Sequence, residues 1–332
     1  MVLGCIGDGF APSVETAAAL SREGLRTIVC GAAPRARAPR NAEAAVVAVD
    51  FSATAPDTIR QAFQALDWLG AQGVRQVLAQ APASPETRAA LAKALLERLA
   101  AGAREDIRVG LVGAAPDPDL AALLAAAPGG RVTLVGADAA SGAANALRPA
   151  GRPTGDASRW RGMDGPGVAI AGSGASATLS QVAHYGERHP TMRIDPEQVM
   201  LGRVTEDDAA RFALDNVERS PLIHSSTSAA LRAGAAARWG ETRVARTMDW
   251  LFGQLAQKLV DAGVTRLVVA GDGTAAAVAE ATRRATFEIG PEIGAGAPAL
   301  IAQGDPPLAL VVKRGGVGAR DFFETALAGL AA

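Results

Sequence analysis

Residues 267–281 read LVVAGDGTAAAVAEA, in which a short apolar run is followed by two glycines and then by alanines. The apolar run at 267–270 is short and uncharged, which is typical of a buried parallel strand. Gly271, Asp272, Gly273 and Thr274 follow at once, and the alanine-rich remainder predicts a helix. The pattern therefore predicts a strand, a glycine turn and a helix N-terminus in direct succession.

The same arrangement occurs twice more in the C-terminal half. The strand predicted at 167–171 leads into GSGAS at 172–176 and a helix, and the strand predicted at 308–312 leads into KRGGVG at 313–318 and a helix through 321–323. The first N–H groups of a helix lack intrahelical partners and carry partial positive charge, so such turns bind anions. Three of them at the carboxyl ends of parallel strands could surround one nucleotide. The alternative is that they are ordinary connections of an α/β protein.

Composition sets limits on the class of protein. The chain has 332 residues, 49% of them hydrophobic, which is enough for about two domains. A net charge of −1 offers no basic field for nucleic acid or anionic membrane. No apolar run approaches a membrane span, and no signal-peptide pattern begins the chain. We therefore expect a cytoplasmic protein that acts on a small molecule, and a homo-oligomer is compatible with this composition.

Cysteine and histidine usage points away from a metal held by protein ligands alone. Cys5 and Cys30 lie in predicted strands, where we expect buried free thiols in a reducing compartment. His184, His189 and His224 do not have the spacing of metal ligands.

The N-terminal half alternates between strands and helices, which is typical of a doubly wound parallel sheet. Ser13 is the predicted N-cap of the first helix, and Gly24 ends it. The predicted strands are 2–6, 26–30, 44–49, 75–78, 107–112 and 131–135, and the predicted helices are 14–23, 56–72, 85–101 and 118–126.

Residues 148–166, RPAGRPTGDASRWRGMDGP, interrupt this alternation and predict an interdomain linker. We accordingly divide the chain into an N-terminal domain (1–150), a linker (151–166) and a C-terminal domain (167–332). The fold class predicted is α/β, with two domains, each a mainly parallel sheet flanked by helices, and a cleft between them. In the C-terminal domain we further expect extended segments at 192–194 and 198–200, a strand at 221–224, one long helix from about 239 to 262, a short segment at 285–289, and a loop at 290–298.

Several segments together resemble the four-carbon acid sugar kinase family, which includes 3-oxo-tetronate and threonate kinases. They occur in the order of the family and at about its spacing, and the resemblance covers most of the chain. The segments are GSGASATLSQV (172–182), VTRLVVAGDGT (264–274), IGPEIGAGAP (289–298) and DPPLALVVKRGGVGARDFF (305–323), with weaker matches at CIGDGFAPSVETAAAL (5–20) and ALDWLGAQGVRQV (65–77).

The resemblance implies an N-terminal domain for an acid sugar, a C-terminal domain for ATP with Mg²⁺, and phosphorylation of a terminal hydroxyl in carbohydrate metabolism. No GxxxxGK[ST] loop is present. The positions that it implies for ATP binding are Ser173, Ser176, Gly271, Asp272, Gly273, Thr274, Lys313, Gly315, Gly316 and Gly318.

The chain departs from the family mainly where the acid sugar would bind. Asp8 is retained from a pair of aspartates, and Gly9 replaces the second. Asp50 and Ser52 stand where the family has a lysine and an arginine, the 80–88 segment lacks a family lysine, and a long insertion after residue 100 is missing. Each lost charge-assisted contact to a carboxylate is worth about 1.5–3 kcal/mol. In the nucleotide turn, a family glutamate has become Gly273.

The candidate residues can be interpreted as functional or as structural. Asp8 is the candidate catalytic base, or a carboxylate that caps the next helix. Asp272 could help to hold Mg²⁺ or serve the turn alone. Lys313 could contact phosphate, whereas Glu292 is expected to fix its own loop, and His224 is expected to be structural.

Three hypotheses follow from the sequence. The chain is an ATP-dependent kinase for a sugar acid or related polyol, with a diverged substrate site. Alternatively, it is a catalytically inactive nucleotide-binding regulatory protein, or a scaffold that has lost nucleotide as well. The sequence alone leaves enzymatic activity open.

Overall fold

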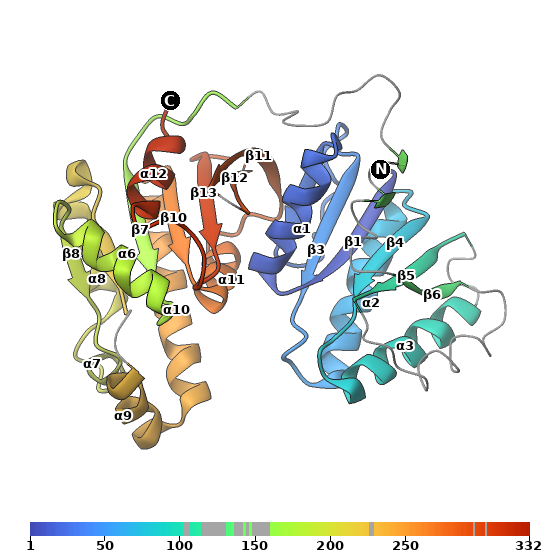
Figure 1. Ribbon diagram of the computed structural model, residues 1–332, viewed down its shortest axis with the longest axis horizontal. Helices are drawn as coiled ribbons and strands as arrows, with labels where there is room; N and C mark the ends of the chain where they lie inside the picture. Colours follow the sequence, from blue (N-terminus) through green and yellow to red (C-terminus); the bar gives the residue numbers. More distant parts are fainter. Residues whose placement is uncertain are drawn as a thin grey trace. The chain divides into compact units, whose positions relative to one another are not determined.

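The computed structural model describes residues 1–101, 106–113, 131–135, 142–143, 146–147, 160–225, 229–294, 296–302 and 304–332. The chain forms two compact units. The first is Met1–Ser158 with Ala285–Ile289, and the second is Arg159–Arg284 with Gly290–Ala332. Both are α/β units in which helices flank a mainly parallel sheet (Figure 1).

The first unit is built on six parallel strands in the order β6-β5-β4-β1-β3-β2, and the start of β11 joins β2 in antiparallel pairing. Its elements are β1 (Leu3–Asp8), α1 (Phe10–Arg22), β2 (Thr27–Cys30), β3 (Ala44–Val49), α2 (Ala55–Ala71), β4 (Gln76–Gln80), α3 (Pro85–Ala100), β5 (Arg108–Val112) and β6 (Val132–Val135).

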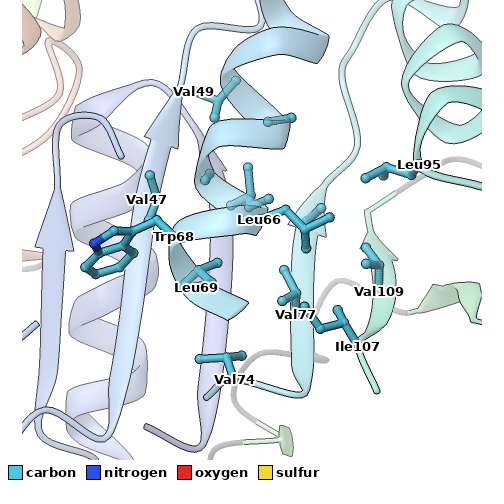
Figure 2. Close-up of a cluster of buried hydrophobic side chains, with 14 of the residues drawn as sticks. Val47, Val49, Leu66, Trp68, Leu69, Val74, Val77, Leu95, Ile107 and Val109 are labelled. Carbon is cyan, nitrogen blue, oxygen red and sulfur yellow. The ribbon is translucent and has the colours of Figure 1, made fainter. Parts of the chain in front are cut away.

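The core of this unit explains why the sequences of its strands are nearly continuous apolar runs. In Figure 1, α1 lies against one side of the sheet and α2 and α3 against the other. Every residue of β3 is buried, and its alternate members Val47 and Val49 pack with Leu66 and Leu69 of α2 (Figure 2). Parallel sheets covered on both faces need apolar side chains on both. Cys5 and Cys30 are buried free thiols, as the sequence predicts.

The second unit has the strand order β12-β13-β10-β7-β9-β8, in which all neighbours are parallel except β12 and β13. Its elements are β7 (Gly167–Ala171), α6 (Ser176–Gly186), β8 (Thr191–Arg193), α7 (Pro196–Met200), α8 (Glu206–Asp215), the 3-10 helix η2 (Val217–Arg219), β9 (Leu222–His224), α9 (Ala229–Trp239), α10 (Glu241–Asp261), β10 (Arg266–Ala270), α11 (Asp272–Ala281), β11 (Phe287–Gly294), β12 (Ala297–Ala302), β13 (Leu308–Lys313) and α12 (Phe322–Gly329).

Small side chains on the central strands let helices pack closely in this unit. Ala169, Ala171 and Ala270 face the aromatic residues Tyr185 of α6 and Phe323 of α12. Helix α10 packs against both α8 and α11, and α11 also lies on β10. The predicted α/β fold class is therefore confirmed in both units.

The start of the first helix differs from the sequence prediction. Helix α1 begins at Phe10 after Gly9, which has φ +70°, so Ser13 is not the N-cap. Ser13 lies inside the first turn, and its Oγ donates a hydrogen bond to the Gly9 carbonyl over 2.6 Å. Pro12 does not prevent this, because first-turn N–H groups have no intrahelical partner to lose.

Three further elements also differ. The long helix expected at about 239–262 is present as α10, but the sequence does not predict α9, which ends at Trp239 before Gly240, whose φ of +85° separates the two helices. Residues 198–200 belong to the short helix α7, which Asp195 caps by accepting from the Glu197 N–H. Most of the loop expected at 290–298 is strand, because β11 continues to Gly294 and β12 starts at Ala297.

The helix predicted at 118–126 and most of the linker predicted at 148–166 lie outside the described residues. Among the helices that are described, none combines the length and apolar character needed to span a membrane. The assignment of the two units to acid sugar and nucleotide remains a prediction.

One buried charge in this fold gives a testable pH dependence. Lys313 ends β13 with only 2% of its surface exposed, and burial lowers its pKa from 10.5 to about 8. Between these values the unfolded chain binds a proton that the folded chain has released, so rising pH favours the folded state.

We predict that the unfolding free energy of the wild type, relative to Lys313→Met, is constant below about pH 7 and rises from about pH 8 toward pH 10.5. Urea denaturation of both proteins across this range measures the difference. A flat difference would contradict the burial of this ammonium group.

Candidate functional site

Parallel pairing brings the three glycine turns to one edge of the second unit. In the register of the sheet, Ala270 of β10 lies opposite Ala171 of β7 on one side and Lys313 of β13 on the other. The three strands therefore end at the same level, and their turns leave the sheet next to one another. This is the arrangement that the repeated strand–glycine–helix pattern predicts.

Close packing of the turns explains two of their glycines. A Cβ atom on Gly172 would overlap the hydroxyl of Thr274, and one on Gly315 would overlap the Oγ of Ser173. Each of the three turns thus touches another at a point where only hydrogen fits. The backbone of all three is consequently held in one compact surface, which a phosphate group could approach closely.

Two helices begin at this surface without a side-chain cap. Helix α6 starts at Ser176 and α11 starts at Asp272, and neither N-cap residue, Ala175 or Gly271, provides a side-chain hydrogen bond. The first-turn N–H groups of a helix point along its axis and carry partial positive charge. Two such ends beside three glycine turns form a surface suited to an anion.

The third turn is fixed by side chains beneath it. The Lys313 ammonium lies 3.1 Å from the Thr178 hydroxyl and 3.0 Å from the Val317 carbonyl oxygen, and Thr178 in turn donates to the Gly315 carbonyl over 2.8 Å. The Lys313 ammonium also lies 5.6 Å from the ring centroid of Phe322. Lys313 is therefore engaged within its own turn, and a direct contact with phosphate remains a prediction.

Two carboxylates stand near the first turn of α11. Asp272 is exposed and pairs with Arg314 over 3.7 Å. Asp249 of α10 accepts a hydrogen bond from the Thr274 hydroxyl over 3.1 Å, and burial raises its pKa while that bond opposes the rise. A Cβ atom on Gly273 would overlap the Asp249 carboxylate. The space next to residue 273, where the resemblance places a glutamate, is thus filled by a carboxylate from another helix.

Sequence reasoning missed Asp249. It belongs to no motif, and its only signal is a polar residue in line with the buried Phe252 and Ala256 on an otherwise apolar helix face. Within the described part of the chain, no group of three His, Cys, Asp or Glu side chains could hold a metal ion.

The first unit gathers polar groups where its central strands end. Asp8 ends β1, next to the end of β3, and its N–H donates to the Gln80 side chain at the end of β4 over 3.1 Å. Asp50 follows β3 and accepts bonds from the N–H and hydroxyl of Ser52. Ligands commonly bind at the carboxyl ends of parallel strands. The predicted catalytic role of Asp8 is compatible with this position and stays a prediction.

The remaining candidates are local. Glu292 accepts from the Gly296 N–H over 2.7 Å and so fixes its own loop, as expected. His224 is buried at the end of β9, beside Ala171 of β7.

Comparison with known proteins adds relatives along nearly the whole chain. A family model described as a nucleotide-binding C-terminal domain matches residues 168–323. The 3-oxo-tetronate kinase of Cupriavidus necator is 29% identical over 98% of this chain and 96% of its own, and that of Pseudomonas savastanoi is 27% identical over 99% and 97%. The 3-oxo-tetronate kinase of Methylobacterium radiotolerans is 34% identical over 71% of this chain and 57% of its own.

Solved structures share the fold. A structure from Salmonella typhimurium, described as a putative tRNA synthase, has a TM-score of 0.71 and 22% identity, covering 98% of both chains. A Haemophilus influenzae protein has a TM-score of 0.71 and 20% identity, covering 99% of this chain and 100% of its own.

The alignment lengths show that this chain is short. The alignment with the Cupriavidus protein has 418 positions and includes 98% of this chain. Because the chain has 332 residues, it can occupy only about 325 of those positions. More than 90 positions of the alignment therefore have no residue here. The nucleotide-binding match and the near full-length kinase relatives together show that this chain is a shortened and divergent member of the four-carbon acid sugar kinase family.

Proposed function

We propose that this chain transfers a phosphoryl group from ATP to a hydroxyl of a small sugar acid or related polyol. The observation that carries the proposal is the common edge of β7, β10 and β13, where three glycine turns meet two uncapped helix N-termini. The kinase relatives and the nucleotide-binding family match support the same reaction class.

The nucleotide would lie on this surface through its phosphates. Backbone N–H groups of the turns at 271–274 and 315–318 and the hydroxyls of Ser173 and Ser176 are the proposed donors. Gly172 and Gly315 allow the turns to pack directly on one another, because a Cβ atom at either would overlap the neighbouring turn, and this packing would keep the proposed donors together. Mg²⁺ bound with ATP would offset charge on the transferring group. In such sites one or two protein carboxylates commonly bind the Mg²⁺ ion, and Asp272 is our candidate for this role.

The acceptor hydroxyl would be oriented by Asp8. A carboxylate at the end of a central strand is well placed to accept the proton of an attacking hydroxyl. The neighbouring Asp50 and Gln80 bring no positive charge, so we propose weaker recognition of the acceptor carboxylate than the family pattern implies. The relatives are called 3-oxo-tetronate kinases, and we propose that the acceptor of this chain is likewise a small sugar acid or a related polyol.

The alternative of a nucleotide-binding protein without turnover is not favoured, because the near full-length relatives are kinases by name. A cytoplasmic location and a homo-oligomer remain predictions.

We predict that Gly316→Asp abolishes stabilisation by ATP·Mg²⁺. Gly316 has open space around it, so the substitution adds a negative charge to the turn without a clash. At a hundredfold excess over Kd, a ligand stabilises the folded state by about 2.7 kcal/mol. Thermal unfolding with and without ATP·Mg²⁺ should show this gain in the wild type and not in the variant.

Gly234→Asp is the matched control. It places the same carboxylate in open space on the exposed surface of α9, at a glycine without positive φ, and should keep the full shift. An equal increase in thermal stability with ATP·Mg²⁺ in all three proteins would show that the nucleotide does not bind at this turn.

We further predict that Asp8→Asn lowers kcat about 10²–10⁴-fold, as loss of a general base does, while ATP affinity is unchanged. A coupled assay for ADP release with four-carbon sugar acids and polyols measures kcat. Asp106→Asn, at an exposed aspartate paired with Arg75, is the control and should leave kcat unchanged. Full activity in Asp8→Asn would exclude this residue as the base.

A further inference from the structure

We propose that Lys313 is a positioning residue of the nucleotide site: its buried ammonium gathers the carbonyl oxygens of the 314–319 loop, so that the N–H groups of this loop face outward toward phosphate. This inference rests on the proposed function. It replaces a direct phosphate contact by Lys313 with an indirect role.

The ammonium group is surrounded by oxygen atoms of the chain. Its Nζ lies 3.3 Å from the Arg314 carbonyl oxygen, 3.4 Å from that of Gly315, 3.0 Å from that of Val317, and 3.1 Å from the Thr178 hydroxyl. The three hydrogens of an ammonium group are thereby all directed at the chain's own acceptors.

Two side chains of α6 complete the same pattern. Thr178 donates to the Gly315 carbonyl, and the Gln181 amide nitrogen lies 2.9 Å from the Gly318 carbonyl oxygen and 2.8 Å from that of Ala319. Thr178 and Gln181 are three residues apart and so share one face of the helix. Five carbonyl groups of the loop, from 314 to 319, are thus turned toward donors below it.

The planar trans peptide converts this into a prediction for the opposite face. The C=O of one residue and the N–H of the next point in opposite directions. Carbonyls of Arg314, Gly315 and Val317 that point at Lys313 therefore aim the N–H groups of Gly315, Gly316 and Gly318 away from it. Successive N–H groups that converge in this way form a concavity for anions.

Charge supports the same interpretation. Among the described residues no carboxylate forms an ion pair with Lys313, and burial lowers its pKa to about 8. A buried cation without a counter-charge costs stability. A phosphate on the far side of the loop would give the ammonium a counter-charge, with the peptide dipoles of the loop aligned between the two.

The experiment compares Lys313→Met with the wild type by calorimetric titration with ATP·Mg²⁺ and, separately, with inorganic tripolyphosphate. Methionine keeps the length of the aliphatic part of the side chain and removes the ammonium group. We expect the affinity for both ligands to fall at least about tenfold, while the melting temperature without ligand does not fall. Lys258→Met, at a lysine paired with Asp207 on the surface of the same unit, removes the same charge and should bind like the wild type.

A second pair of variants separates positioning from general stability. Thr178→Ser keeps the hydroxyl that donates to Gly315 and should retain affinity, whereas Thr178→Val removes it and should lose affinity. If Lys313→Met does not fold, this pair of variants still tests whether the groups beneath the 314–319 loop position it for phosphate binding. Unchanged affinity in Lys313→Met or in Thr178→Val, with a wild type that binds ATP, would overturn the positioning role. Absence of ATP binding by the wild type would instead overturn the proposed function.

Discussion

The parallel pairing of β10 with β7 and β13 is the constraint on which the functional part of this molecule depends. It places Ala171, Ala270 and Lys313 at one level, and so fixes where three turns and two helices begin. A slip of any one strand would separate the turns and turn its buried residues to the other face. Because side chains on both faces of these strands are buried and closely packed, a slipped strand would no longer fit its neighbours.

Interlocking of the turns then sets their detailed shape. Gly172 against Thr274 and Gly315 against Ser173 are contacts that tolerate no side chain. Thr274 is held from behind by Asp249, and the 314–319 loop is held from below by Lys313, Thr178 and Gln181. The side chains of this site thus act mainly on the backbone, and the backbone presents the donors. Such preorganised donors are effective toward phosphoryl groups because they need no rearrangement when charge develops.

The sequence predicts the parts of this arrangement that are local. A short apolar run, a glycine turn and an alanine-rich helix are visible within fifteen residues, and their repetition at 172–176 and 313–318 predicts that they meet. Parts that depend on distant residues could not be predicted. Asp249 reaches Gly273 from α10, and no local pattern marks it as part of the site. From the sequence, Lys313 is expected to contact phosphate directly. In the structure its ammonium group is surrounded by backbone carbonyl oxygens, which come from residues that fold around it. Gly9 rather than Ser13 is the N-cap of α1, and its positive φ, which favours glycine, precedes a helix that begins at Phe10.

Hydrogen–deuterium exchange of the wild type, followed by mass spectrometry with and without ATP·Mg²⁺, tests whether the three glycine turns form one nucleotide site. If the nucleotide lies on the common edge of β7, β10 and β13, peptides that cover 172–178, 271–275 and 314–319 should all exchange more slowly with ATP present. Protection confined to one of these turns, or found only elsewhere in the chain, would contradict a single nucleotide site built from all three.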